Sequence, residues 1–173
     1  DKKSFYRAVL ILVIPLALQN LINVGVTATD VIMLGKVGEK VLSGASLGGQ
    51  VQFIMTLIFF GLTSGASVLI AQYWGKGDVP TIEKVLGMSL KISVTIAFAF
   101  AVVTYAVPVP IMHLLSSDGQ VVTEGAKYLR IVCFSYMFTA VTMVYLNTLR
   151  SVERVLISTV VYTVSLLTNI VMN

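Results

Sequence analysis

Five long stretches without a charged residue constrain this chain more than any other feature. They hold 22, 35, 26, 19 and 19 residues and cover positions 8–29, 41–75, 92–117, 131–149 and 155–173. Each is long enough to cross the roughly 30 Å hydrocarbon core of a bilayer as a helix that rises about 1.5 Å per residue. Only 12% of the 173 residues are charged, against about a quarter in soluble domains. The sequence therefore predicts a protein that is solvated by lipid.

The predicted fold class is all-α, a polytopic helical membrane protein that forms a single membrane domain over residues 1–173. Its five transmembrane helices are expected at about 8–34, 47–73, 85–107, 128–149 and 155–173. Strands of a membrane barrel would be about 10 residues long with alternating polarity, whereas "ISVTIAFAFAVVTYAVPVP" is apolar on all sides for longer. Short polar connections make adjacent helices antiparallel, and residues 108–127 are expected to include a short interfacial helix. The chain stops inside an apolar run, so we expect at least one further span beyond it.

Basic residues lie at the predicted helix ends and form no single patch, which argues against a nucleic-acid partner despite the net charge of +4. Membrane lipids are the expected surroundings. With the N-terminus in the cytoplasm, eight basic residues lie inside and four outside, as the positive-inside rule requires. The inside set is Lys2, Lys3, Arg7, Lys76, Lys84, Lys91, Arg150 and Arg154, and the outside set is Lys36, Lys40, Lys127 and Arg130. We therefore expect a multi-pass protein of the plasma or bacterial inner membrane.

Signatures of enzymes are weak in this sequence. "GASLG", residues 44–48, fits the nucleophile-elbow pattern by letter, but that elbow needs a strand-to-helix turn and a histidine partner, and here it opens a membrane helix. The single histidine, His113, is expected at the interface, and the single cysteine, Cys133, inside a helix as a small apolar residue. The sequence contains no H-E-x-x-H, C-x-x-C or Walker-A pattern. We expect no enzyme and no cofactor.

Two glycine pairs have the G-x-x-x-G spacing, Gly44 with Gly48 and Gly61 with Gly65. Small residues four positions apart lie on one helix face and let another backbone approach closely. Helix packing within the bundle is the role we expect for them.

Asp30 is the one acid inside the first predicted helix, with four apolar residues after it. An ionised carboxylate in hydrocarbon costs several kcal/mol, so such a residue normally faces a bundle interior, a cavity or a partner. A helix-end acid that reaches the outer interface is the alternative. Spacing supports the interior, because Gln19, Asn23 and Thr27 precede Asp30 on the same helix face and make a polar stripe.

The fifth predicted helix carries a similar stripe, made of Ser158, Tyr162, Ser165, Asn169 and Asn173. Two polar faces suggest a shared wet cavity lined by Gln19, Asn23, Thr27, Tyr162 and Ser165. In that topology both asparagines lie in the same half of the membrane as Asp30. A carboxylate beside amide oxygens suits a hard cation such as Na⁺, or a proton if burial raises the carboxyl pKa. The open alternative for the asparagines is interhelical hydrogen bonding without an ion. Pro15 lies fifteen residues before Asp30, and its missing N–H donor predicts a kink there.

These residues resemble the N-terminal half of a multidrug and toxic compound extrusion (MATE) transporter. The motifs that carry the resemblance are "IPLALQNL", "TDVIMLGKVGEKVLSGASLGGQ", "GLTSGASVLIAQYWGKGD", "YLRI", "YLNTLRS" and "TNIVMN", which touch four of the five predicted helices in the family's order. Flippases for lipid-linked saccharides share this general fold.

The resemblance implies an antiporter of two six-helix lobes, of which this chain holds five helices of the first. It implies export of small organic, often cationic, substrates in exchange for H⁺ or Na⁺, with Asp30, Asn169 and Asn173 as the cation pocket and Pro15 as a hinge. Many members have an aspartate where this chain has Asn173, and often a glycine in the "RSVER" connection.

The function predicted from sequence is thus a secondary active exporter of drugs or other organic compounds, with H⁺ or Na⁺ as coupling ion. Its missing C-terminal remainder is an expected partner of the chain. A flippase of the same fold, an ion channel and an intramembrane enzyme are the alternatives.

Overall fold

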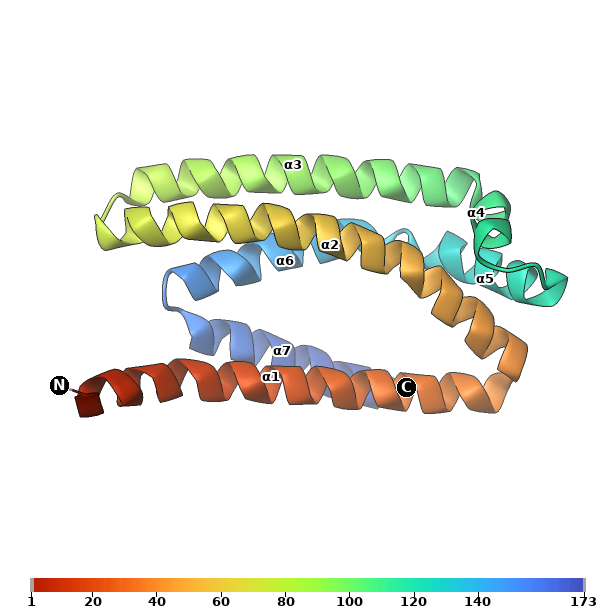
Figure 1. The fold of residues 1–173 in the computed structure, drawn as a ribbon, viewed down its shortest axis with the longest axis horizontal. Helices are drawn as coiled ribbons and strands as arrows, with labels where there is room; N and C mark the ends of the chain where they lie inside the picture. The colour runs from red at the N-terminus through yellow and green to blue at the C-terminus, as the bar shows by residue number, and fades with distance from the viewer. Residues whose placement is uncertain (1, 173) are drawn as a thin grey trace. The chain divides into compact units, whose positions relative to one another are not determined.

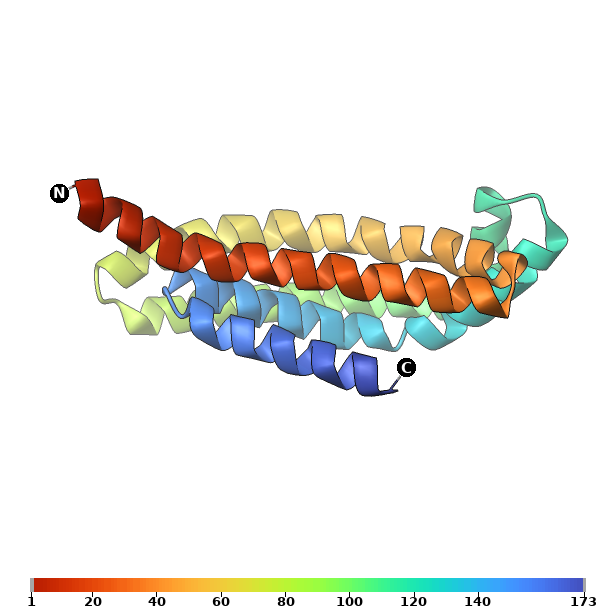
Figure 2. The same ribbon diagram turned by 90° about the horizontal axis from the view of Figure 1, so that it is seen from below.

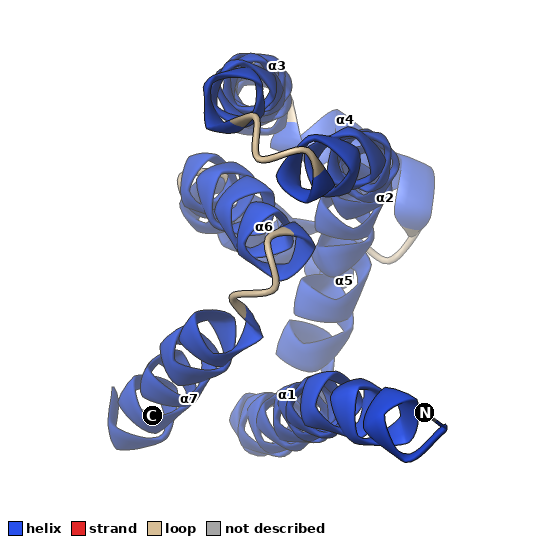
Figure 3. Cartoon of the chain, turned by 90° about the vertical axis from the view of Figure 1, so that its left-hand side faces the viewer, coloured by secondary structure: helices blue, strands red, loops and turns tan. Residues whose placement is uncertain are grey.

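The computed structural model of the protein describes the backbone of residues 2–172, in which there are seven helices and no strand (Figures 1 and 3). The helices are α1 (Lys2–Val37), α2 (Glu39–Gly75), α3 (Val79–Ala106), α4 (Pro108–Leu115), α5 (Gly119–Val132), α6 (Ser135–Ser151) and α7 (Val155–Met172). The described side chains leave out residues 1–9, 11, 12, 15, 16, 19, 30, 37, 155, 162, 166, 167 and 169–173. The predicted all-α class is confirmed.

The helices divide into two compact units. One combines α1 up to residue 33 with the segment from residue 153 that forms α7, the red and dark blue helices of Figure 2. The other runs from residue 34 to residue 152 and contains α2 to α6. In this second unit α2 packs against α3, α5 and α6, while α3 also packs against α6 (Figure 1). The prediction of a single membrane domain stays a prediction.

Two of the described helices, α2 and α3, are long and apolar enough to cross a membrane. Helices α5 and α6 reach the same length and composition together, although they bend by 56° at residues 133–134. The fourth predicted span therefore differs from a straight helix over 128–149. Spans in α1 and α7, where many side chains lie outside the described residues, stay predictions.

Helix α5 occupies a segment that the sequence predicts to be mostly a connection, because residues 119–127 contain polar and charged side chains. Its amphipathic pattern explains the difference. Val121, Val122, Gly125, Ala126 and Leu129 are buried and recur every three or four residues, which is the period of a helix with one apolar face. The charged residues lie on the remaining positions, and α4 is the short helix expected between 108 and 127.

Helix α3 begins at Val79, six residues before the predicted start, because Asp78 caps it. The Asp78 carboxylate accepts hydrogen bonds from the Thr81 backbone N–H at 3.2 Å and from the Thr81 hydroxyl at 2.7 Å. The bond from the backbone satisfies one of the free N–H groups of the first turn. The hydroxyl bond and then the backbone bond also stabilise the charged carboxylate, so the Thr81 contacts hold the pKa of Asp78 below its usual value.

The core of the second unit lies between α2, α3 and α6. Its buried members are Met55 and Phe59 of α2, Ala97 of α3, and Cys133, Tyr136 and Ala140 at or after the α5–α6 bend. A second cluster joins Met112 of α4 to Val122, Ala126 and Leu129 of α5. Cys133 is buried, as predicted, but it lies in the turn between α5 and α6 and not inside a helix. Helix α2 belongs to the first cluster through Met55 and Phe59 and packs against the second through Leu47 and Val51.

Two connections are shorter than predicted, and α2 begins at Glu39, eight residues before its predicted start at residue 47. Gly38 alone separates α1 from α2, with a φ of 154°. The "RSVER" connection turns at Glu153, which has a φ of 60°. A side chain in this left-handed conformation costs roughly 1–2 kcal/mol that a glycine avoids, so the turn explains why a glycine suits this connection.

Candidate functional site

The predicted cation site lies mostly outside the described side chains. Those of Asp30, Asn169, Gln19, Tyr162 and Pro15 are not among the described ones, and Asn173 lies beyond the described residues. Their backbones place the predicted residues 15, 19 and 30 within α1 and 162 and 169 within α7, two helices of one compact unit. The cation site and the Pro15 hinge therefore stay predictions.

Three candidate cavity residues are described. Asn23, Thr27 and Ser165 are all exposed in this chain. The Thr27 hydroxyl donates a 3.0 Å hydrogen bond to the Asn23 carbonyl one turn earlier. Such a bond satisfies a hydroxyl inside an apolar helix while its oxygen lone pairs still accept bonds from other groups. The exposed polar face of α1 is thus compatible with a wetted surface.

The first glycine pair, Gly44 and Gly48, forms a close contact between helices and does not form a catalytic turn. Helix α2 is continuous through residues 44–48, so a nucleophile elbow is excluded there. A Cβ added at Gly44 would lie 2.7 Å from the Gly125 nitrogen, and one at Gly48 would lie 2.8 Å from the Tyr128 ring. Helices α2 and α5 therefore touch through their backbones at Gly44 and Gly125, as the G-x-x-x-G spacing predicts.

The second glycine pair behaves differently. A Cβ added at Gly61 or Gly65 would meet no atom within 4 Å among the described residues. Both glycines instead line a shallow apolar pocket between α2 and α3, together with Met88 and Ile92. Close packing at this pair is thus absent from the described part of the chain.

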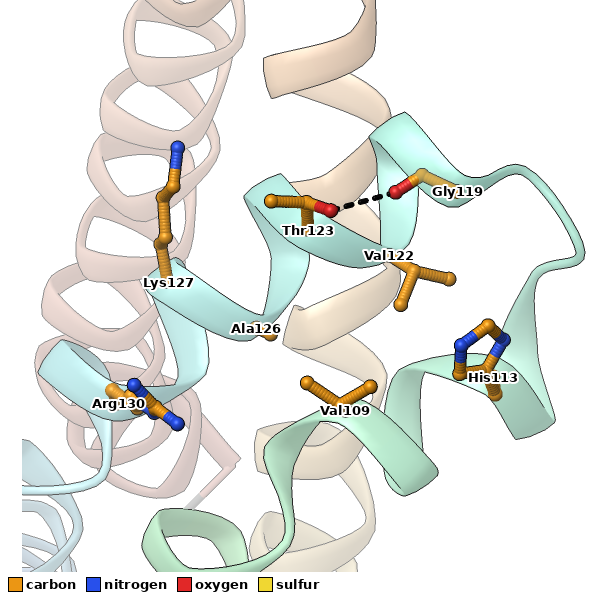
Figure 4. Close-up of a pocket in the computed structure, with 8 residues that line it drawn as sticks. All are labelled: Val109, His113, Gly119, Val122, Thr123, Ala126, Lys127 and Arg130. Atoms are coloured by element: carbon orange, nitrogen blue, oxygen red, sulfur yellow. Dashed lines mark hydrogen bonds between the residues drawn. The ribbon is translucent and has the colours of Figure 1, made fainter.

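A pocket of about 350 Å³ lies between α4 and α5 (Figure 4). Its lining residues are Val109, His113, Gly119, Val122, Thr123, Ala126, Lys127 and Arg130. The buried Val122 and Ala126 form an apolar floor with Val109, while Arg130 and His113 lie at opposite ends of it (Figure 4). Three of the eight lining residues are basic and none is acidic. Helix periodicity in α5 places Val122, Ala126 and Arg130 on one face.

The acids nearest this pocket in the sequence are each bound by a lysine. Asp118, the N-cap of α5, pairs with Lys40 of α2 and accepts backbone hydrogen bonds from Gln120 at 2.9 Å and Val121 at 3.3 Å. Glu124 pairs with Lys127 at 2.7 Å within α5. The Lys40 ammonium, and then the two backbone N–H groups, hold the pKa of Asp118 below its usual value.

The lowered pKa of Asp118 predicts a pH dependence of stability. Because the folded state favours the ionised carboxylate, its contribution is complete above the unfolded pKa of about 3.8 and is lost as pH falls through the lower folded value. We expect Asp118→Asn, which keeps a capping side chain, to remove this dependence below about pH 4 with only a small change at pH 7, since exposed pairs contribute little. Melting temperatures measured from pH 7 down to about pH 2 test this. A wild-type curve parallel to that of Asp118→Asn would contradict it.

The sequence does not predict this pocket, since it indicates only an interfacial place for His113 and an outer-side place for the basic residues Lys127 and Arg130. A signal was present, because "VVTEGAKYLR" places apolar residues at helical spacing with Arg130 one turn after Ala126. The packing of α5 against α4 cannot be predicted from the sequence, because nothing in the local pattern indicates which helix covers the apolar face of α5. His113 lies exposed in the last turn of α4, in accord with its expected interfacial place.

Together, the apolar helices and the small-residue contact define a helical membrane protein. The chain matches the family described as MatE over residues 15–173. It belongs to this family, whose members are membrane transporters and not enzymes.

Proteins similar to this chain include two named as probable multidrug resistance proteins. NorM of Bradyrhizobium diazoefficiens is 30% identical over 115 residues, which are 66% of this chain and 24% of that protein. YoeA of Bacillus subtilis is 23% identical over 151 residues, 87% of this chain and 33% of that protein. A protein named FAD transporter from Shewanella oneidensis is 23% identical over 147 residues, 85% of this chain and 32% of that protein. The chain thus spans about a quarter to a third of the length of these curated relatives.

Proposed function

We propose that this chain is part of a secondary active transporter that exports drugs or other organic compounds in exchange for H⁺ or Na⁺. The observation that carries the proposal is membership of the MatE family over residues 15–173, with relatives named for multidrug resistance. The substrates are small organic molecules, some of them cationic. The remainder of the transporter supplies the other side of the substrate cavity.

Asp30 is the coupling group in this proposal. An ionised carboxylate at this depth is costly, and binding a proton or Na⁺ removes most of that cost by changing the local charge. Asn169 and Asn173 supply amide oxygens to the same ion, and Pro15 is the hinge whose bend moves with it. Support comes from the placement of α1 and α7 in one compact unit, since these helices carry the two polar stripes.

The coupling cycle is a population shift between two packings of the lobe. A cation bound to Asp30 from outside favours the packing that releases substrate outward, and loss of the cation inside restores the other one. In the proposed orientation the N-terminus is cytoplasmic and the protein lies in the plasma or bacterial inner membrane. Eight basic residues on the inner side against four on the outer side support that orientation.

Replacing Asp30 by asparagine in the full-length protein tests the coupling role. We expect drug export from cells to fall by about tenfold or more, because asparagine cannot change charge and so no longer biases the two packings. Drug accumulation and its dependence on the ion gradient are the measurements. Thr29→Val is the matched control, since the neighbouring Thr29 hydroxyl bonds only the Gly25 carbonyl at 3.0 Å among the described residues. Unchanged export and ion dependence in Asp30→Asn would refute the proposal.

Export of a flavin dinucleotide is a second candidate, favoured by the similarity to the FAD transporter of Shewanella oneidensis over 85% of this chain. The two candidates differ in substrate charge. Proteoliposomes that hold the full-length protein and are loaded with either a cationic dye or FAD separate them. Ion-driven movement of FAD alone would replace the multidrug proposal with the narrower one.

A further inference from the structure

We propose that the pocket between α4 and α5 binds the phosphate group of an anionic phospholipid, with Arg130 as the principal contact. This site is separate from the cation site on α1 and goes beyond the proposed export function. The pocket's volume of about 350 Å³ lies within the range of small-ligand pockets, roughly 300–1,000 Å³.

The charge of the lining points to an anion. Of its three basic residues, Lys127 is already paired with Glu124, which leaves Arg130 and His113 at the two ends of the apolar floor (Figure 4). Among the described residues neither side chain has a carboxylate partner. A guanidinium is planar and presents paired donors that match two oxygens of one phosphate. The N-terminal N–H groups of α5 add little, because the Asp118 carboxylate already accepts from two of them.

The position of the pocket relative to the membrane favours a lipid as the source of the phosphate. Helix α3 has 28 residues, or about 42 Å at 1.5 Å per residue, which is close to the full thickness of a bilayer with its headgroups. Val109 lies three residues after the end of this helix, so the pocket is at headgroup level. On the proposed orientation this is the outer leaflet.

Exposed apolar side chains next to the pocket supply a surface for acyl chains. Leu114 follows His113 and is 88% exposed, while Ile131 follows Arg130 and is 76% exposed. Phe134, one turn after Arg130, is 66% exposed. Basic groups that border apolar surface match a lipid, which carries its phosphate directly above its hydrocarbon chains.

Binding of short-chain phosphatidylglycerol to the detergent-purified full-length protein tests the proposal. Phosphatidylcholine of the same chain length and inorganic phosphate are the comparison ligands, and intact-complex mass spectrometry with melting temperatures gives the affinities. We expect phosphatidylglycerol to bind most tightly and Arg130→Gln to weaken it about tenfold. Arg130→Lys, which keeps the charge without the paired donors, should lose less.

Two lysine variants serve as matched controls. Lys127→Gln removes a charge that is already paired, and Lys91→Gln removes an exposed one from α3, so both should weaken binding less than Arg130→Gln. Equal losses in Lys91→Gln and Arg130→Gln would overturn the proposal, because they would indicate attraction to surface charge in general. Unchanged binding in both Arg130 variants would overturn it too. Inorganic phosphate that binds as tightly, with the same Arg130 dependence, would overturn the lipid assignment and leave a site for free phosphate.

Discussion

Replacing Gly44 by valine is expected to separate α2 from α5 and to lower the free energy of unfolding by about 3 kcal/mol, the upper part of the range for overpacked sites. A Cβ at this position would lie 2.7 Å from the Gly125 nitrogen, 3.0 Å from the Val121 carbonyl oxygen and 3.2 Å from the Gly125 Cα. All three atoms belong to the α5 backbone, so no side chain can rotate away. The helices must move apart instead.

The surrounding contacts make this movement costly. Gly125 faces the same contact from the other side, since a Cβ there would lie 3.0 Å from the Gly44 carbonyl oxygen and would also meet the flexible end of the Met112 side chain. The ion pair between Lys40 and Asp118 connects the same two helices about one turn away. A shift of α5 would therefore disturb this ion pair and the packing of Met112 against α5.

Gly49→Val is the matched control for Gly44→Val, because it lies on the same helix and a Cβ there would meet no described atom within 4 Å. Both substitutions change helix propensity equally, so their difference reports the helix contact alone. Thermal and denaturant unfolding of the full-length protein in detergent measures it. Equal melting temperatures for the two variants would contradict the close contact.

Phe59→Ala is expected to cost about 3 kcal/mol, the lower end of the range for buried phenylalanine. The ring is fully buried and packs with Met55, Ala97 and Tyr136 between α2, α3 and α6. In a membrane the transfer from water contributes little to helix association, because lipid tails are as apolar as the core. The remaining cost is the cavity and the lost dispersion contacts.

Phe60→Ala is the matched control for Phe59→Ala, because it removes the same side chain without leaving a cavity. Phe60 is the next residue of α2 and is 66% exposed. Its removal leaves lipid or detergent in place of the ring and creates no cavity, so we expect a change within about 0.5 kcal/mol. Unfolding of both variants in the same detergent is the measurement. Similar losses at the two positions would show that the core between α2, α3 and α6 is not packed as described.

Local sequence patterns predicted the helical class and the approximate spans, because the need to satisfy backbone groups in lipid applies to each segment separately. They also predicted that Gly44 and Gly48 serve packing, and the structure confirms this. The same patterns did not predict α5 before residue 128. Its charged residues are typical of a connection, whereas its apolar face is buried against α2 and α4.

Local sequence patterns do not predict which helix packs against which. Gly61 and Gly65 have the same spacing as Gly44 and Gly48, yet a Cβ at the former pair would meet nothing within 4 Å among the described residues. The two pairs differ in the helix that faces them, because the backbone of α5 approaches Gly44 closely at Gly125. The predicted cation site at Asp30 stays a prediction, with its side chain outside those described.

The sequence by itself determined that this chain is an all-helical membrane protein, since composition alone sets which segments are stable in hydrocarbon. Only the tertiary structure decided which helices touch and where the Arg130 pocket forms. The physical reason is distance along the chain. Gly44 and Gly125 are 81 positions apart, and their close approach depends on two complementary surfaces that neither segment encodes alone.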